Sequence, residues 1–182
     1  MNFFSYILFG LSMGLIAMLT FRACTLHTKI QLSRGLAYSF LLASVQTLFL
    51  LFGIWFGSLW RFSTGNLDSY VFVGIMLLLA AKLSLNLFDK KNGTAYDISR
   101  FSTLFLLSIA LGINDLIGGM GIGFLAYVQQ AWLIASLPLF LLVFLLSYLG
   151  IMLGRRNIEI KQRRWTLFAV LFVLVAIVMV LL

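Results

Sequence analysis

One acidic residue, Asp115, lies in the middle of a long apolar stretch and is the first candidate for chemistry. A carboxylate at the centre of a membrane-spanning helix costs about 2.5–3.5 kcal/mol on insertion scales, so it is rarely present without a function. On a helix, Asp115 shares a face with Gly112, Gly119 and Ile122, a surface suited to close packing. Two interpretations stay open. Asp115 is either an ion or proton site between helices, or a structural, protonated Asp hydrogen-bonded to Ser or Asn on a neighbouring helix.

Three neutral polar residues in apolar stretches are further candidates: Asn114, Gln46 and Ser12. The amide oxygen of Asn114 can coordinate a hard cation, although it adds no charge. Gln46 and Ser12 are residue types that commonly form hydrogen bonds between membrane helices, worth about 0.6–2 kcal/mol each. Each of the three is therefore either part of a site or a structural contact.

Lys82 is the other charged residue well inside an apolar stretch, about two turns from the end of the stretch 69–88. Its amino group either reaches the membrane interface along its own helix or pairs with Asp115. The long apolar stem of lysine favours the first interpretation.

The elements that carry these residues are six long apolar stretches. About 20 apolar residues span a bilayer, and the stretches that qualify are 3–21, 35–60, 69–88, 101–125, 131–154 and 165–182. Hydrophobic residues make up 63% of the chain and charged residues 10%, whereas a soluble domain carries about 25% charged residues. We therefore predict an all-α integral membrane protein, with residues 1–182 forming one transmembrane domain in a lipid bilayer.

The basic residues predict the orientation of this domain. Eleven of them fall in the connections after the first, third and fifth stretches, and one, Arg61, follows the second. Short basic loops stay in the cytoplasm, so both termini are predicted to face outward. The net charge of +8 is explained by these loops, and no nucleic-acid partner is predicted.

Other kinds of site are excluded by composition. Cys24 is the single cysteine and His27 the single histidine, so an internal disulfide and an ordinary zinc site are excluded. Both residues are expected in the loop after the first stretch, in structural roles. The sequence has no nucleophile–base pair, phosphate-binding loop or nucleotide-binding domain. We therefore predict no enzyme and no bound cofactor, and any transport is driven by an ion gradient or by the substrate's own gradient.

Two internal similarities suggest a repeat. The segments 11–16 and 111–116 resemble each other, and a G-x-x-x-G pair at 53–57 recurs at 150–154. The paired segments cross the membrane in opposite directions. This pattern favours an inverted repeat of three plus three helices, an architecture that is common among secondary transporters.

Five parts of the chain, taken together and in order, match a known pattern: 8–17 with 25–27, 44–57, 81–88, 113–125 and 147–155. In this set the sequence resembles the bacterial manganese efflux pump family (MntP type). The resemblance implies six helices in an inverted repeat, outward termini, a multi-pass location in the bacterial inner membrane, and Mn²⁺ as a transported substrate.

The sequence departs from the family pattern at three positions. Gly14, Gln46 and Asn114 stand where the family has Asp, Glu and Asp, so the chain resembles a divergent member. The resulting transport-site hypothesis contains Asp115, Asn114, Gln46 and Ser12. Export of a divalent cation, manganese first, is the leading function. The alternatives are a same-fold exporter of another small solute, and a non-transporting membrane subunit that has lost the metal site.

Overall fold

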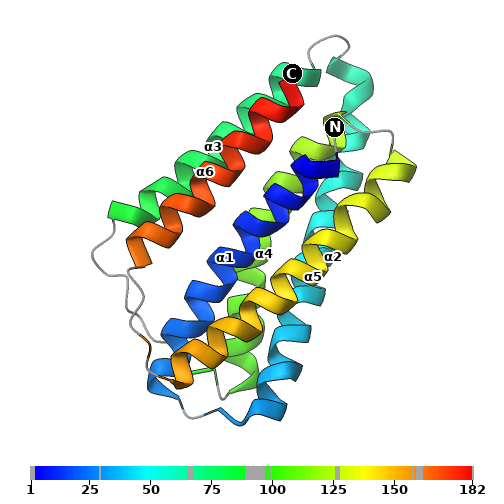
Figure 1. Ribbon diagram of the computed structural model, residues 1–182. Helices are drawn as coiled ribbons and strands as arrows, with labels where there is room; N and C mark the ends of the chain where they lie inside the picture. The colour runs from blue at the N-terminus through cyan, green and yellow to red at the C-terminus, as the bar shows by residue number, and fades with distance from the viewer. Residues whose placement is uncertain are drawn as a thin grey trace.

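The computed structural model shows six long helices in the described part of the chain and no strand there (Figure 1). It describes residues 3–28, 30–64, 68–88, 97–98, 100–125, 128–156, 158 and 162–181. The helices are α1 (Phe3–His27), α2 (Leu32–Thr64), α3 (Asp68–Phe88), α4 (Phe101–Leu125), α5 (Val128–Arg155) and α6 (Gln162–Leu181). All six are long and apolar enough to cross a membrane, which confirms the predicted fold class.

The helix ends differ from the prediction near the first basic connection. α1 continues to His27 and α2 begins at Leu32, so Arg22 and Arg34 lie on helices instead of in a loop. Cys24 is also on α1, where its side chain is buried. The prediction ended the first helix too early because it treated charge as a stop signal. A long basic side chain can extend its charged end toward the interface while its backbone stays helical.

Two helix pairs have the most extensive contacts in the bundle. α1 packs most extensively on α5, and α2 on α4. α2 also contacts α5, α1 contacts α6, and α3 contacts both α4 and α6. Figure 1 shows α3 and α6 side by side along one flank, with α2 and α5 on the opposite flank.

Glycines bring α2 and α4 together. A Cβ added at Gly53 would overlap the carbonyl oxygen of Leu116, and one added at Gly57 would overlap that of Met120. On α4, Gly119 has the same relation to the carbonyl oxygen of Leu50. Small residues let helix backbones approach closely. Because the contacts advance along both helices in the same sense, α2 and α4 run parallel.

The α1–α5 pair is built in the same way. A Cβ added at Gly150 would overlap the carbonyl oxygen of Met18, and one at Gly154 would lie 2.8 Å from the carbonyl oxygen of Arg22. These contacts also advance together, so α1 and α5 are parallel neighbours.

The apolar core follows one face of α1. Phe9, Met13, Ala17 and Phe21 recur at every fourth residue and are all buried. Large apolar side chains on the outer faces of the bundle are exposed, among them Leu48, Leu78, Leu106, Leu137 and Phe168. An exposed apolar surface around the whole bundle is what lipid covers.

Candidate cation-binding site

Asp115 is completely buried in the middle of α4, with an exposed fraction of 0%. On the same helix face, Gly112 lies against the ring of Phe49, and Gly119 against the main chain of Leu50. Asp115 therefore lies on the side of α4 that packs on α2. Neither of its carboxylate oxygens has a hydrogen-bond partner among the described residues. A buried carboxylate without a donor requires a cation or a proton.

Gln46 lies on the matching face of α2. It precedes Leu50 by four residues and Gly53 by seven, so it shares their helix stripe toward α4. Its side chain is buried, and its Oε1 atom has no hydrogen-bond partner in the described structure. Among the described residues, Asp115 and Gln46 thus bring unpartnered oxygens to the α2–α4 interface: both carboxylate oxygens of Asp115 and Oε1 of Gln46.

Asn114 forms a hydrogen bond with a residue of α3. Nζ of Lys82 on α3 donates a hydrogen bond of 2.6 Å to Oδ1 of Asn114. The amino group of Lys82 therefore points to the middle of α4. The favoured prediction, that it reaches the interface, was wrong, and its partner is Asn114 and not Asp115.

Lys82 and Asn114 line a cavity of about 410 Å³ between α1, α3, α4 and α6. Thr20, near the end of α1, and Gln162 and Thr166, at the start of α6, also line it. These helix ends border the basic connections of the chain. The cavity therefore lies in the half of the bundle nearest those connections, and Asn114 lies at its inner end.

Asn114 and Asp115 therefore lie on different faces of α4. Consecutive residues of an α-helix project about 100° apart. Asn114 meets α3 and the cavity, whereas Asp115 lies on the α2 side. The structure brings Gln46 and Asp115 to one helix interface, and it brings Asn114 together with Lys82.

Ser12 is joined to neither group. Its hydroxyl donates a hydrogen bond of 2.8 Å to the carbonyl oxygen of Ala169, and this bond connects α1 to α6. The nearby Gly14 is closely covered by α5. A Cβ there would lie 2.6 Å from Cδ1 of Leu146 and 3.0 Å from the carbonyl oxygen of Leu142. A side chain at this position would displace the end of Leu146 and crowd the main chain of α5 at Leu142.

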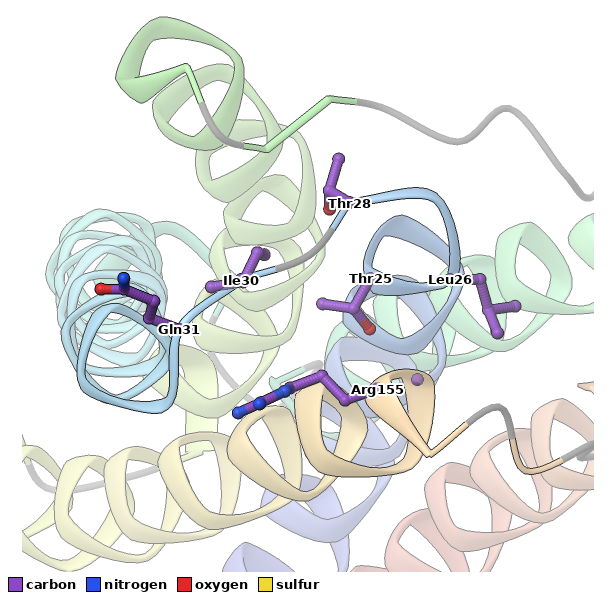
Figure 2. A pocket seen from close by; sticks show the side chains of 7 residues that line it. Thr25, Leu26, Thr28, Ile30, Gln31 and Arg155 are labelled. Atoms are coloured by element: carbon purple, nitrogen blue, oxygen red, sulfur yellow. The ribbon is translucent and has the colours of Figure 1, made fainter.

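A second cavity was not predicted from the sequence. It measures about 470 Å³ and lies where the end of α1, the start of α2 and the end of α5 meet. Figure 2 shows Arg155 of α5 extending toward the segment that carries Gln31. Thr25 lines this cavity too, but its hydroxyl donates to the carbonyl oxygens of Phe21 and Arg22 in its own helix.

One contact of a basic residue was also missed. Nε of Arg22 on α1 donates a hydrogen bond of 3.0 Å to the carbonyl oxygen of Ile158, between α5 and α6. No sequence pattern indicates this contact, because the two residues are far apart in the chain. It joins the main chain at Ile158 to α1.

No group of three or more His, Cys, Asp or Glu side chains that could hold a metal ion is found among the described residues. The residues that the candidate site does offer are one carboxylate, that of Asp115, and the amide oxygens of Gln46 and Asn114. Such a donor set is typical of hard cations, which accept carboxylate, carbonyl and water oxygens.

Comparison with known proteins gives one family match. The sequence model described as "Mntp: Putative manganese efflux pump" matches residues 29–182, that is, the chain from just after α1 to its end. No curated protein and no solved structure gives a match.

Proposed function

The chain belongs to the Mntp family of manganese efflux pumps, and from this premise we propose that it is a secondary transporter that exports Mn²⁺ across a bacterial inner membrane. The observation that carries the proposal is Asp115, a fully buried carboxylate whose oxygens have no partner among the described residues. A buried carboxylate with a purely structural role is expected to accept hydrogen bonds from neighbouring groups. A carboxylate that binds and releases a cation is expected to have oxygens without such partners when the cation is absent.

The position of the cavity supports loading from the cytoplasm. It lies at the end of the bundle that borders the basic connections, and the positive-inside rule assigns that end to the cytoplasm. A cation that entered here would reach Asn114 first. Asp115, one residue further along α4, lies behind it on the α2 side.

The proposed ligands follow from the open oxygens. Asp115 supplies the negative charge, and Gln46 supplies an amide oxygen from the same interface. Asn114 supplies a second amide oxygen once Lys82 has left it. Ser12 contributes only if its bond to α6 opens. Because Asp115 and Asn114 project about 100° apart, we propose that a rotation of α4, or a water molecule on the cation, joins the two sides.

An inverted repeat would supply the movement. In such a repeat α1, α2 and α3 correspond to α4, α5 and α6. The contact of α1 with α5 then corresponds to that of α4 with α2, and the contact of α1 with α6 to that of α4 with α3. All four contacts are present. The glycine contacts agree with this, since Gly150 against Met18 corresponds to Gly53 against Leu116. Transporters of this architecture alternate access by moving one half against the other around a site near the midplane.

The test is manganese export by cells that lack other manganese exporters and produce either the wild type, Asp115→Asn or Asp97→Asn. Asp97 is exposed and lies outside the six helices, so Asp97→Asn makes the same chemical change away from the site. We expect the wild type and Asp97→Asn to lower cellular manganese. Asp115→Asn should lose at least about 90% of that export, because it removes the negative charge that stabilises a divalent cation in a low-dielectric site.

Equal export by all three chains, at equal amounts in the membrane, would show that Asp115 has no part in transport. Failure of the wild type itself to change cellular manganese would reject manganese as the substrate.

One observation favours a second candidate. The contact between Lys82 and Asn114 places a positive charge in the cavity, which suits a less charged solute better than Mn²⁺. We propose a same-fold exporter of a small organic solute as the alternative. Export assays with a panel of amino acids would support it if the wild type left manganese unchanged and lowered one of these solutes.

A further inference from the structure

The amino group of Lys82 occupies a position that a transported cation would use. It is 2.6 Å from Oδ1 of Asn114, an amide oxygen that lies at the inner end of the cavity and is itself almost completely buried. An ammonium group and a hard metal cation seek the same acceptor. An ammonium group and a divalent cation on the same oxygen would lie close together and repel each other, so binding of one disfavours the other.

We propose that Lys82 is a tethered competitor of the transported cation: it binds Asn114 when the site is empty, leaves when the cation arrives, and helps to displace the cation when it returns. This inference rests on the proposed export function and adds the means by which the same site is emptied. Lys82 is a residue that sets the affinity and release of the substrate, and it is not itself a ligand of that substrate.

The charges near the centre of α4 support this role. Among the described residues that line the cavity, Lys82 is the one with a charged side chain. Lys82 therefore brings a positive charge to Asn114. A metal cation that binds to the same oxygen has to overcome the repulsion of that charge.

The placement of Lys82 also allows it to move. Its side chain is largely exposed, whereas Asn114 is buried. A lysine side chain has four rotatable carbons and presents its charge as a single point, so it can leave an acceptor without disturbing the backbone.

The test compares Lys82→Met, Lys82→Arg and Arg156→Met with the wild type, all purified in detergent. Methionine keeps most of the length of the side chain and removes its charge. Arginine keeps the charge. Arg156 is exposed at the same end of the bundle and outside this cavity, so Arg156→Met controls for the loss of one positive charge. Mn²⁺ alone is the probe, and its binding is followed by the loss of the paramagnetic resonance signal of the free ion.

We expect Lys82→Met to bind Mn²⁺ at least about tenfold more tightly than the wild type, since a nearby positive charge no longer opposes the ion. Lys82→Arg and Arg156→Met should stay within about twofold of the wild type. In proteoliposomes, Lys82→Met should show a lower KM for Mn²⁺ and a maximal rate reduced at least about fivefold, because release slows. A merely structural lysine would not lower KM and the rate together.

The outcomes separate this inference from the proposed function. If the wild type exports Mn²⁺ and Lys82→Met binds it no more tightly, the Lys82 inference is overturned and the export function stands. If the wild type does not export Mn²⁺ but Lys82→Met binds it far more tightly, the competitor role is supported and the export function fails. If neither chain binds Mn²⁺, both are overturned.

Discussion

Two neighbouring residues of α4 divide the chemistry of the candidate site. The carboxylate of Asp115 is enclosed on the α2 side without a donor in the described structure, while the amide of Asn114 borders a cavity and is bound by Lys82. The candidate site contains one carboxylate, whose single negative charge does not balance the two positive charges of Mn²⁺. Adding a second carboxylate on the α2 side should therefore strengthen binding of the metal.

Gln46→Glu makes that change at a position whose oxygen has no partner in the described residues. We expect Mn²⁺ to bind at least about tenfold more tightly, because a second negative charge on the α2–α4 interface acts through a low-dielectric interior. The measurement is an equilibrium titration of the purified protein. Gln31→Glu, in the exposed segment before α2, is the control and should leave the affinity unchanged. A Gln46→Glu chain that folds normally and shows no tighter binding would place Gln46 outside the site.

Helices α2 and α4 are in backbone contact because each presents glycine to the other. The carbonyl oxygen of Leu116 occupies the space that a side chain at Gly53 would need, and Gly119 has the same relation to Leu50. Main-chain atoms of a long helix cannot yield locally as the end of a flexible side chain can. The distance between these helices is therefore set by the absence of side chains.

Gly53→Ala tests this at the level of the helix pair. The added methyl group would meet the main chain of α4, so we expect the free energy of unfolding to fall by about 1–3 kcal/mol. Gly74→Ala on α3 is the matched control, since a Cβ there meets nothing within 4 Å. That control should be neutral or stabilising by about 0.5–1 kcal/mol, because alanine favours a helix more than glycine does. Denaturation in mixed micelles measures both, and equal stabilities of the two variants would contradict the packing argument.

The six helices were predictable from the sequence, but which helices pack against one another was not. Apolar length and basic connections predict six helices because lipid requires both. Asp115 was singled out because a lone acid in an apolar stretch is conspicuous by composition. The contact between Lys82 and Asn114 was missed, because no local pattern says that α3 lies beside α4. The proposed repeat shows the same limit: pairing Met18 with Leu116 by their glycine contacts shifts the alignment by two residues from the sequence match between 11–16 and 111–116.

The bundle as a whole has one strongly basic end. The exposed Arg34, Arg100, Arg155 and Arg156 belong to it. The cavity lined by Lys82 and the cavity lined by Thr25 and Arg155 also lie toward this end. Anionic headgroups and the positive-inside rule both favour a cytoplasmic position for such an end. The orientation of the molecule therefore decides which compartment fills the cavity.

Cysteine labelling tests this orientation. In a Cys24→Ala background, Asn2→Cys and Arg156→Cys each provide one thiol, the first at the N-terminus and the second at the exposed basic end. With a membrane-impermeant maleimide, we expect Asn2→Cys to react in intact cells and Arg156→Cys to react only after permeabilisation. The reverse pattern would invert the proposed topology and turn the cavity outward, so that loading from the cytoplasm could not be maintained.

The parallel pairing of α1 with α5 has a consequence for the making of the protein. α1 ends at residue 27 and α5 begins at residue 128, so the ribosome needs roughly 5–20 s to supply the partner after α1 has emerged. During that time the face of α1 that carries Met18 and Gly14 has no α5 to cover it. During this time α1 must therefore contact lipid or the insertion machinery. A chain cut short before α5 would present this face to the quality-control proteases of the membrane.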